Sequence, residues 1–226
     1  IGSGLVGSEM CIRDRVLIMQ FLLDAFLSIP AILIAFSVKE YTRAKMADKL
    51  GDKSPRFKGE LTLDPLKHVD IAGALMMAFF GFGWSKSVEI NKYAFKNPKK
   101  DALKVNIAAW LSNLVVAIIG VILTSLYLRF FGLRGDLSQI IFLMLQYIII
   151  LNVNFFVFNI LPLPGLDCFR ILEDLKPQLF YKLSGIVYQY YYPILIVIIL
   201  LGRYVLAIPS QLVLSLVHIS EPTRPE

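Results

Sequence analysis

Residues 16–50 read VLIMQFLLDAFLSIPAILIAFSVKEYTRAKMADKL, an apolar run that continues into a charged end. A helix needs roughly 20 apolar residues to cross the hydrocarbon core of a bilayer, and no proline or glycine interrupts 37–50. The stretch therefore predicts a membrane-spanning helix with an amphipathic end that stops at Gly51. Three further apolar stretches predict three more spanning helices: Val105–Leu128, Ser138–Leu161 and Ile186–Ile208.

Composition supports a membrane protein. Of the 226 residues 57% are hydrophobic, and the mean hydropathy is +0.66. This is more apolar material than one soluble core of this size buries, so lipid must solvate part of it. We find no repeat or soluble linker, and the membrane core reads as one domain.

The segment between the first two apolar stretches predicts smaller elements. Alternating polar and apolar residues at 57–63 and 84–91 indicate two short strands, which could pair at the membrane surface. Residues 71–84 are apolar but too few for a straight crossing, so we expect a short re-entrant helix. The predicted fold is an all-α polytopic membrane protein with about four transmembrane helices, one short helix and a small surface β-hairpin.

Charge gives an orientation. The formal net charge is +6, and 17 of the 23 Lys and Arg residues lie in 39–70, 85–104 and 163–185. Cytoplasmic loops retain basic residues, so we expect the loops within 39–104 and 163–185 to be cytoplasmic, with the bilayer as partner and no nucleic acid. The two ends, 1–15 and 215–226, resemble translated sequencing-adapter read-through, which places the natural membrane domain at 16–214.

Four quoted stretches carry a resemblance. They are AFSVKEYTRAKMADKLGDKSPRFKGELTLDPLKHVD (35–70), FGFGWSKSVEIN (80–91), AAWLSNL (108–114) and NILPLPGLDCFRIL (159–172). In order and spacing they resemble the motifs of the site-2 proteases, which are intramembrane zinc metalloproteases. The resemblance implies a site-2 protease-like core over about 16–172.

The resemblance also implies where a catalytic centre would stand. The family's H-E-x-x-H puts two imidazoles on one zinc ion, with Glu as general base for the bound water. Here Lys39, Glu40 and Arg43 hold those positions, and Asp167 aligns with the third metal ligand. Neither a lysine ammonium nor a guanidinium has a lone pair for zinc. Further motif positions with substrate or structural roles are Asn113, Asn159, Pro162 and Pro164.

We therefore expect a catalytically inactive pseudoprotease, without a zinc cofactor, that binds transmembrane or juxtamembrane segments or an active paralogue. Lys39 and Arg43 would pair with Asp167 and Glu40 inside the bundle, because two such cations carry the same +2 charge as zinc with two neutral histidines. The alternative for these two residues is that they are ordinary charges at a helix end, with Asp167 capping a loop.

Two other functions stay open. One is an active intramembrane zinc metallopeptidase with a rearranged site, for which His68, Asp167 and Cys168 offer residual metal donors. His68 has a second interpretation, in which it fixes a turn through hydrogen bonds. The other function is transport, with Asp24 or Asp167 as intramembrane acidic groups, although no inverted repeat supports it.

Overall fold

The computed structural model describes residues 3–133, 135–198, 200–201 and 211. Its elements in chain order are α1 (Ser3–Leu50), α2 (Ser54–Phe57), α3 (Pro65–His68), α4 (Ile71–Phe80), η1 (Lys92–Ala94), α5 (Pro98–Phe130), α6 (Asp136–Phe158), α7 (Asp167–Leu175) and α8 (Pro177–Gln189). The long first helix ends as predicted, since Gly51 adopts a φ of 122°, a conformation that L side chains rarely adopt.

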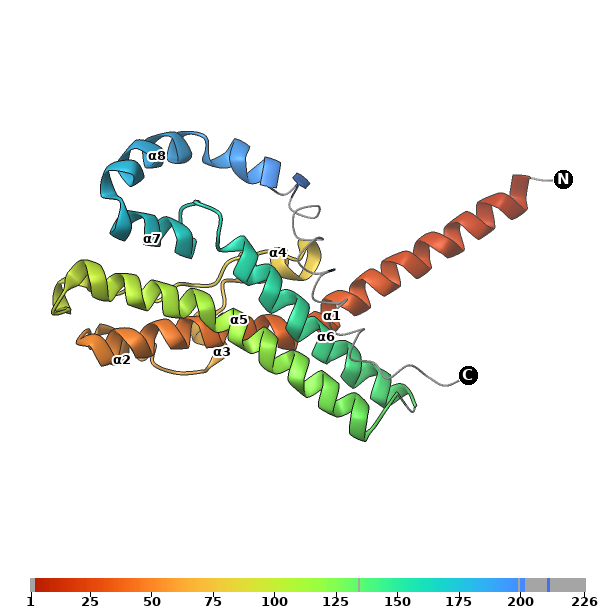
Figure 1. Cartoon of the computed structure of the whole chain (residues 1–226). Helices are drawn as coiled ribbons and strands as arrows, with labels where there is room; N and C mark the ends of the chain where they lie inside the picture. Colours follow the sequence, from red (N-terminus) through yellow and green to blue (C-terminus); the bar gives the residue numbers. More distant parts are fainter. Residues whose placement is uncertain (1–2, 134, 199, 202–210, 212–226) are drawn as a thin grey trace.

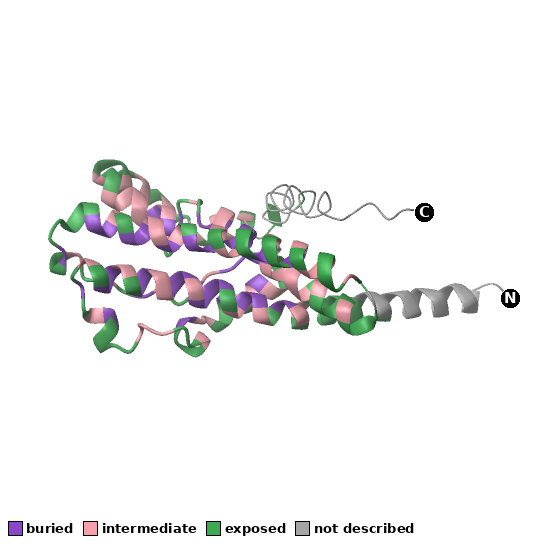
Figure 2. Ribbon diagram, turned by 60° about the horizontal axis from the view of Figure 1, so that its bottom comes forward, coloured by how far each residue is buried: buried purple, intermediate pink, exposed green. Residues whose placement is uncertain are grey.

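Helices α1, α5 and α6 pack side by side and form the centre of the molecule (Figure 1). Their buried faces are unusual for a soluble protein because small and polar residues point inwards. On α5 the buried positions include Ala109, Ala117, Gly120 and Thr124, whereas large residues such as Ile122 are exposed. Such an arrangement suits helices that pack closely within lipid, and Figure 2 shows the buried positions along the inner helix faces.

Three described helices are long and apolar enough to cross a membrane: Ile18–Leu50 of α1, all of α5 and all of α6. The short apolar stretch predicted at 71–84 is helical only over the ten residues of α4, which packs against α1. The predicted fourth crossing, 186–208, is not seen as one helix, because α8 ends at Gln189 and a turn at Tyr190 precedes a helical stretch at 191–198. Most of the remainder lies outside the described residues.

The predicted β-hairpin is wrong for the described residues, which contain no strand. The first predicted strand is replaced by α2 and a turn. The second segment, 82–91, has no regular secondary structure, and we call it the extended segment because it runs as an elongated connection between α4 and η1 (Figure 1). Its backbone N–H groups bond to partners other than a strand: Lys86 N–H donates to His68 O (2.9 Å) and Val88 N–H to Glu40 Oε2 (2.9 Å). Buried side chains and turns thus satisfy the donors that a sheet would have paired.

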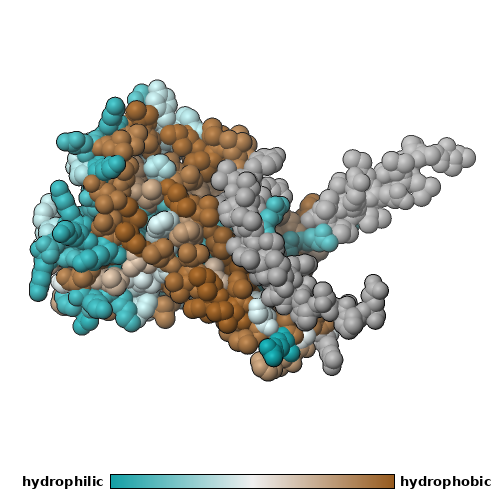
Figure 3. All heavy atoms as spheres, viewed as in Figure 1, coloured by the Kyte–Doolittle hydropathy of each residue, from teal (hydrophilic) through white to brown (hydrophobic). Residues whose placement is uncertain are grey.

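The remaining short helices gather at one end of the bundle. Helix α7 packs against α5 and α8 packs against α7, at the same end as α2. In Figure 3 the hydrophilic surface covers this end, on the left of the view, and hydrophobic surface covers the long helices. The polar loops and the site described next therefore lie toward one end of the apolar bundle.

Candidate functional site

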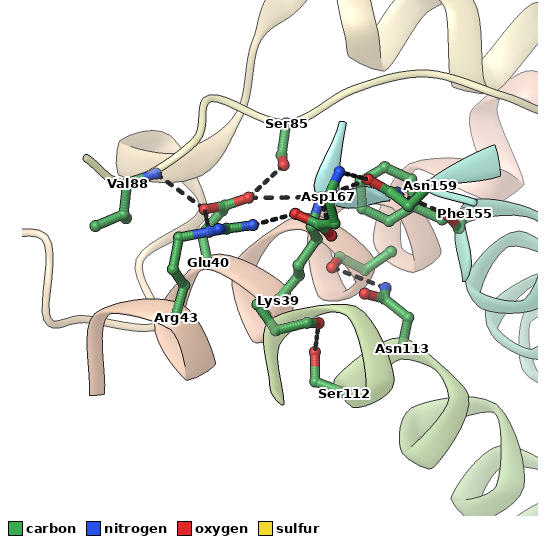
Figure 4. A network of polar contacts seen from close by, with 12 residues as sticks. Lys39, Glu40, Arg43, Ser85, Val88, Ser112, Asn113, Phe155, Asn159 and Asp167 are labelled. Atoms are coloured by element: carbon green, nitrogen blue, oxygen red, sulfur yellow. Dashed lines mark hydrogen bonds and ion pairs between the residues drawn. The ribbon is translucent and has the colours of Figure 1, made fainter. Parts of the chain in front are cut away.

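Helix α1 places three of the predicted site residues inside the bundle. Lys39 is 2% exposed, and Glu40 and Arg43 are 0% exposed, so none faces open water. Lys39 and Arg43 are one helical turn apart, which brings their side chains to the same face. Figure 4 shows both cations pointing toward Asp167 rather than away from the bundle.

Asp167 reaches this cluster from the first turn of α7. It follows a loop that turns at Gly165, and it is also 0% exposed. Its Oδ1 accepts a hydrogen bond from the Arg43 guanidinium, and its Oδ2 lies 3.1 Å from Lys39 Nζ. The four side chains of Lys39, Glu40, Arg43 and Asp167 form what we call the ion cluster, which is closed and has no net formal charge.

The ammonium of Lys39 sits between the two acidic positions. Its Nζ is 3.8 Å from Glu40 Oε1 in addition to the Asp167 contact, and it donates to Asn159 Oδ1 at 3.0 Å. It also lies 4.6 Å from the centroid of the Phe155 ring, a cation–π geometry. The Lys39 ammonium thus contacts both carboxylates and occupies the space between them that a bound metal cation would need.

Glu40 is held by three donors. Arg43 Nε lies 3.1 Å from Oε2, the Val88 N–H donates to the same oxygen at 2.9 Å, and the Ser85 hydroxyl donates to Oε1 at 2.7 Å. A general base must reach the proton that it abstracts. With three protein donors and no exposed surface, this carboxylate is arranged to bind its neighbours rather than a water molecule.

Polar contacts continue from Arg43 toward the surface. Arg43 donates to Asn106 Oδ1 (2.6 Å), Asn106 donates to Asp174 Oδ2 (3.0 Å), and Lys92 Nζ donates to Asp174 Oδ1 (2.7 Å). The buried guanidinium therefore has every side of its fork partnered, which is the condition for a stable buried charge.

Opposing effects act on the Asp167 carboxyl. Burial by itself would raise its pKa, but the positive charges of Lys39 and Arg43 outweigh burial and hold the pKa below its ordinary value. Asp167 is therefore ionised near neutral pH, and the cluster is an ionic one.

The donor set does not fit a zinc ion. Two of the three positions that would supply ligands carry a protonated ammonium and a guanidinium, which donate hydrogen bonds and offer no lone pair. The third, Asp167, is engaged by both of these cations. Within the described part of the chain, no group of three or more His, Cys, Asp and Glu residues stands in a metal-holding arrangement. The residual donors considered from the sequence, His68, Asp167 and Cys168, are thus not brought together.

The other predicted residues take structural positions. The Asn113 amide donates to Ala35 O (3.1 Å) and Asn152 Oδ1 (3.0 Å), which joins α5 to α1 and α6. Asn159 accepts a hydrogen bond from Lys39 and so lies beside the ion cluster. Of the two prolines in the loop before α7, Pro162 is exposed and Pro164 lines a cavity.

Two residues lie away from the cluster contacts. His68 is fully buried, and its Nε2 is 2.8 Å from Thr62 O, so its ring lies against the turn that precedes α3. Asp24 is exposed on α1, where its carboxylate interacts with the Tyr147 hydroxyl of α6. Neither position supplies a donor to Glu40 or Asp167.

Sequence reasoning missed Ser85, Asn106 and Arg170. Ser85 stands in a stretch whose resemblance was recognised, but its hydroxyl gave no reason to choose it. Asn106 had a usable signal, because an amide within an otherwise apolar helix needs a partner. Arg170 follows Asp167 by three residues, which places it on the same side of α7.

No protein-family model matches the chain, and no solved structure matches it. A curated protein of Bacillus subtilis (strain 168), described as "Putative zinc metalloprotease YwhC", is 36% identical over 170 residues. The match covers 73% of this chain and 75% of that relative. The motifs of the sequence and the extent of this match agree, and the chain belongs to the site-2 protease-like family of membrane metalloproteases.

Proposed function

We propose that this chain is a non-catalytic member of its family, a pseudoprotease that binds transmembrane or juxtamembrane segments of other proteins. The observation that carries the proposal is the closed ion cluster. Lys39 and Arg43 stand at the metal-ligand positions and neutralise Glu40 and Asp167 from within the protein. The chain thereby keeps the charge balance of a zinc centre without the lone pairs that hold zinc.

Binding can persist without catalysis because the contacts of the ion cluster also hold the neighbouring segments in place. Glu40 anchors the extended segment through Ser85 and Val88, and Lys39 anchors the end of α6 through Asn159. An extended segment held in this way can present its free backbone edge to another chain. The partner would be a membrane segment of another protein. If an active paralogue cleaves the same segments, this chain would compete with it for them.

We also propose that the polar end of the bundle faces the cytoplasm of a bacterial cell, with the functional domain at 16–214. The concentration of Lys and Arg in 39–70, 85–104 and 163–185 supports this orientation. The tail at 215–226 lies outside the described residues, whereas 3–15 continue α1.

The test is proteolysis of a model transmembrane substrate by the purified protein, with zinc and with a chelator, beside the variant Glu40→Gln. We expect no cleavage above background under any condition. Chelator-sensitive cleavage by the natural sequence, lost in Glu40→Gln, would establish the alternative, an active zinc metallopeptidase with a rearranged site, and would refute the proposal.

A further inference from the structure

A cavity of about 230 Å³ lies between the extended segment and the loop that precedes α7. Ser85 and Ser87 form one wall, Pro164 lies on the loop side, and Tyr191 contributes from beyond α8. Most of the lining is apolar. Arg170 is the charged side chain that lines this cavity among the described residues, so a single guanidinium defines its electrostatics.

Arg170 is an unmatched cation. Among the described residues it forms no hydrogen bond or ion pair. The carboxylates whose charges act on it have other partners at close range. Glu40 and Asp167 pair with Lys39 and Arg43 within the ion cluster. Glu89 is 2.9 Å from Lys58, and Glu173 is 3.1 Å from Lys92. Because the ion cluster is itself neutral, Arg170 leaves one excess positive charge at the cavity.

The surroundings make this charge costly. Burial and the nearby Arg43 lower the pKa of Arg170 below its ordinary value, and the more distant charges of Glu40, Asp167 and Glu173 offset this only in part. An anion placed in the cavity would relieve both effects. A carboxylate is suited to the task because its two oxygens match the fork of a guanidinium.

The backbone beside Arg170 indicates what would carry the anion. Along the extended segment, the N–H groups of Lys86 and Val88 point inwards, to His68 O and Glu40. Backbone groups alternate in direction along an extended chain, so we expect those of Ser85 and Ser87 to point the other way, and both residues line the cavity. No backbone hydrogen bond of these two serines is found within the described residues. A peptide backbone can pair with both the N–H and the C=O groups of this free edge, whereas a lipid phosphate can only accept from its N–H groups.

We propose that this cavity binds a single acidic side chain, Asp or Glu, on an extended segment of a partner protein, with Arg170 as the residue that selects it. The inference rests on the proposed binding function and names the class of segment that is bound. The volume supports one side chain, since it is below the roughly 300–1,000 Å³ of typical small-molecule sites. The partner segment would pair with the edge at Ser85 and Ser87 and insert its carboxylate toward the guanidinium.

The test uses the full chain in nanodiscs of neutral phosphatidylcholine and three fluorescent eight-residue peptides that alternate Val and Thr. The peptides differ at one central position, which is Glu, Gln or Lys. A charge-assisted pair in a partly desolvated cavity predicts that the Glu peptide binds about 10- to 100-fold more tightly than the Gln peptide, with the Lys peptide weakest. Arg170→Gln should remove this preference, Arg170→Lys should keep part of it, and Arg129→Gln, a change at an exposed arginine of α5, should leave it intact.

Several outcomes would overturn the inference. Equal affinities for the Glu and Gln peptides, or a preference that survives Arg170→Gln, would remove the acid-selective cavity while the binding function stands. Failure of all three peptides to bind would remove both. Binding of phosphatidylglycerol nanodiscs that depends on Arg170, without a peptide preference, would identify a lipid headgroup as the ligand. If Arg170→Gln does not fold, the ratio of the affinities for the Glu and Gln peptides, compared between the natural sequence and Arg170→Lys, tests the inference instead. Zinc-dependent cleavage would refute the non-catalytic function without touching this selectivity.

Discussion

Replacing Lys39 and Arg43 together by histidine should convert the ion cluster into a metal site. The two positions are separated by one helical turn, and Asp167 already lies within contact of both side chains. Two imidazoles at this spacing and one carboxylate make three protein ligands, the number found in catalytic zinc sites. We therefore expect the purified double variant to carry close to one zinc ion per chain and the natural sequence to carry almost none.

The structure also sets the energetic scale. Without metal, the double variant leaves Glu40 and Asp167 buried without their ion-pair partners, and breaking a buried pair in this way costs about 3–5 kcal/mol. Zinc at about 1,000 times its dissociation constant would return about 4 kcal/mol by mass action. The apo variant should thus unfold well below the natural protein, and zinc should restore most of the difference.

The assay is metal analysis of the detergent-solubilised protein, combined with thermal unfolding with and without zinc. Lys45→His with Lys49→His is the matched control, because these lysines have the same spacing on α1 but are exposed, and the carboxylate of the intervening Asp48 is already paired with Lys53 and Arg56. Its zinc should be lost on dialysis. Near-stoichiometric zinc in the natural sequence, or no zinc-dependent stabilisation of the cluster variant, would refute the reasoning.

Three further predictions concern stability. Asp167→Asn should lower the free energy of unfolding by about 3–5 kcal/mol, because two buried cations lose their partner; chemical denaturation measures this, and the exposed Asp136→Asn should change it little. The pKa of Asp167 in the folded protein is below the unfolded value of about 3.9. The stabilisation that its carboxylate provides is therefore complete above about pH 4 and is lost as the pH falls through the folded pKa. Thermal unfolding between pH 7 and pH 3 should show a decrease in the unfolding temperature that is smaller in Asp167→Asn. Gly73→Ala should cost about 1–3 kcal/mol or more, since a Cβ there would lie 1.9 Å from Trp84 O, whereas Gly185→Ala in α8 meets nothing within 4 Å and should be neutral or stabilising; equal midpoints for the two variants would contradict the close approach.

The sequence predicted the long helices well because their signal is local. Each depends on an apolar run that the bilayer requires, and α1, α5 and α6 appear where those runs stand. The hairpin prediction failed for the opposite reason. Alternation at 84–91 predicts a strand, but it does not tell whether the hydrogen-bond partner is another strand or a buried carboxylate such as Glu40, and here it is the carboxylate.

The ion cluster was partly accessible from the sequence. The pairing of Lys39 and Arg43 with Asp167 follows from helical spacing and the cost of a buried carboxylate. Asn106 could have been noticed as an amide that needs a partner, but the partners of Ser85 and Asn106 were not accessible, because each residue comes from an element whose position depends on tertiary packing. A single polar residue in a long sequence does not specify which of many distant groups it will meet.

The three donors to Glu40 bear on what kind of protein this is. In a metallopeptidase the glutamate must release a proton to substrate, so its oxygens have to remain partly free. Here the same carboxylate ties α1 to the extended segment, and Lys39 ties α1 to the end of α6 through Asn159. Opening the cluster to admit water would therefore loosen the two walls that enclose the neighbouring cavity. In the non-catalytic protein that we propose, retention of a binding surface and loss of a reactive centre would both follow from one set of contacts, and selection for binding alone would be sufficient to keep Glu40 and Asp167 in place.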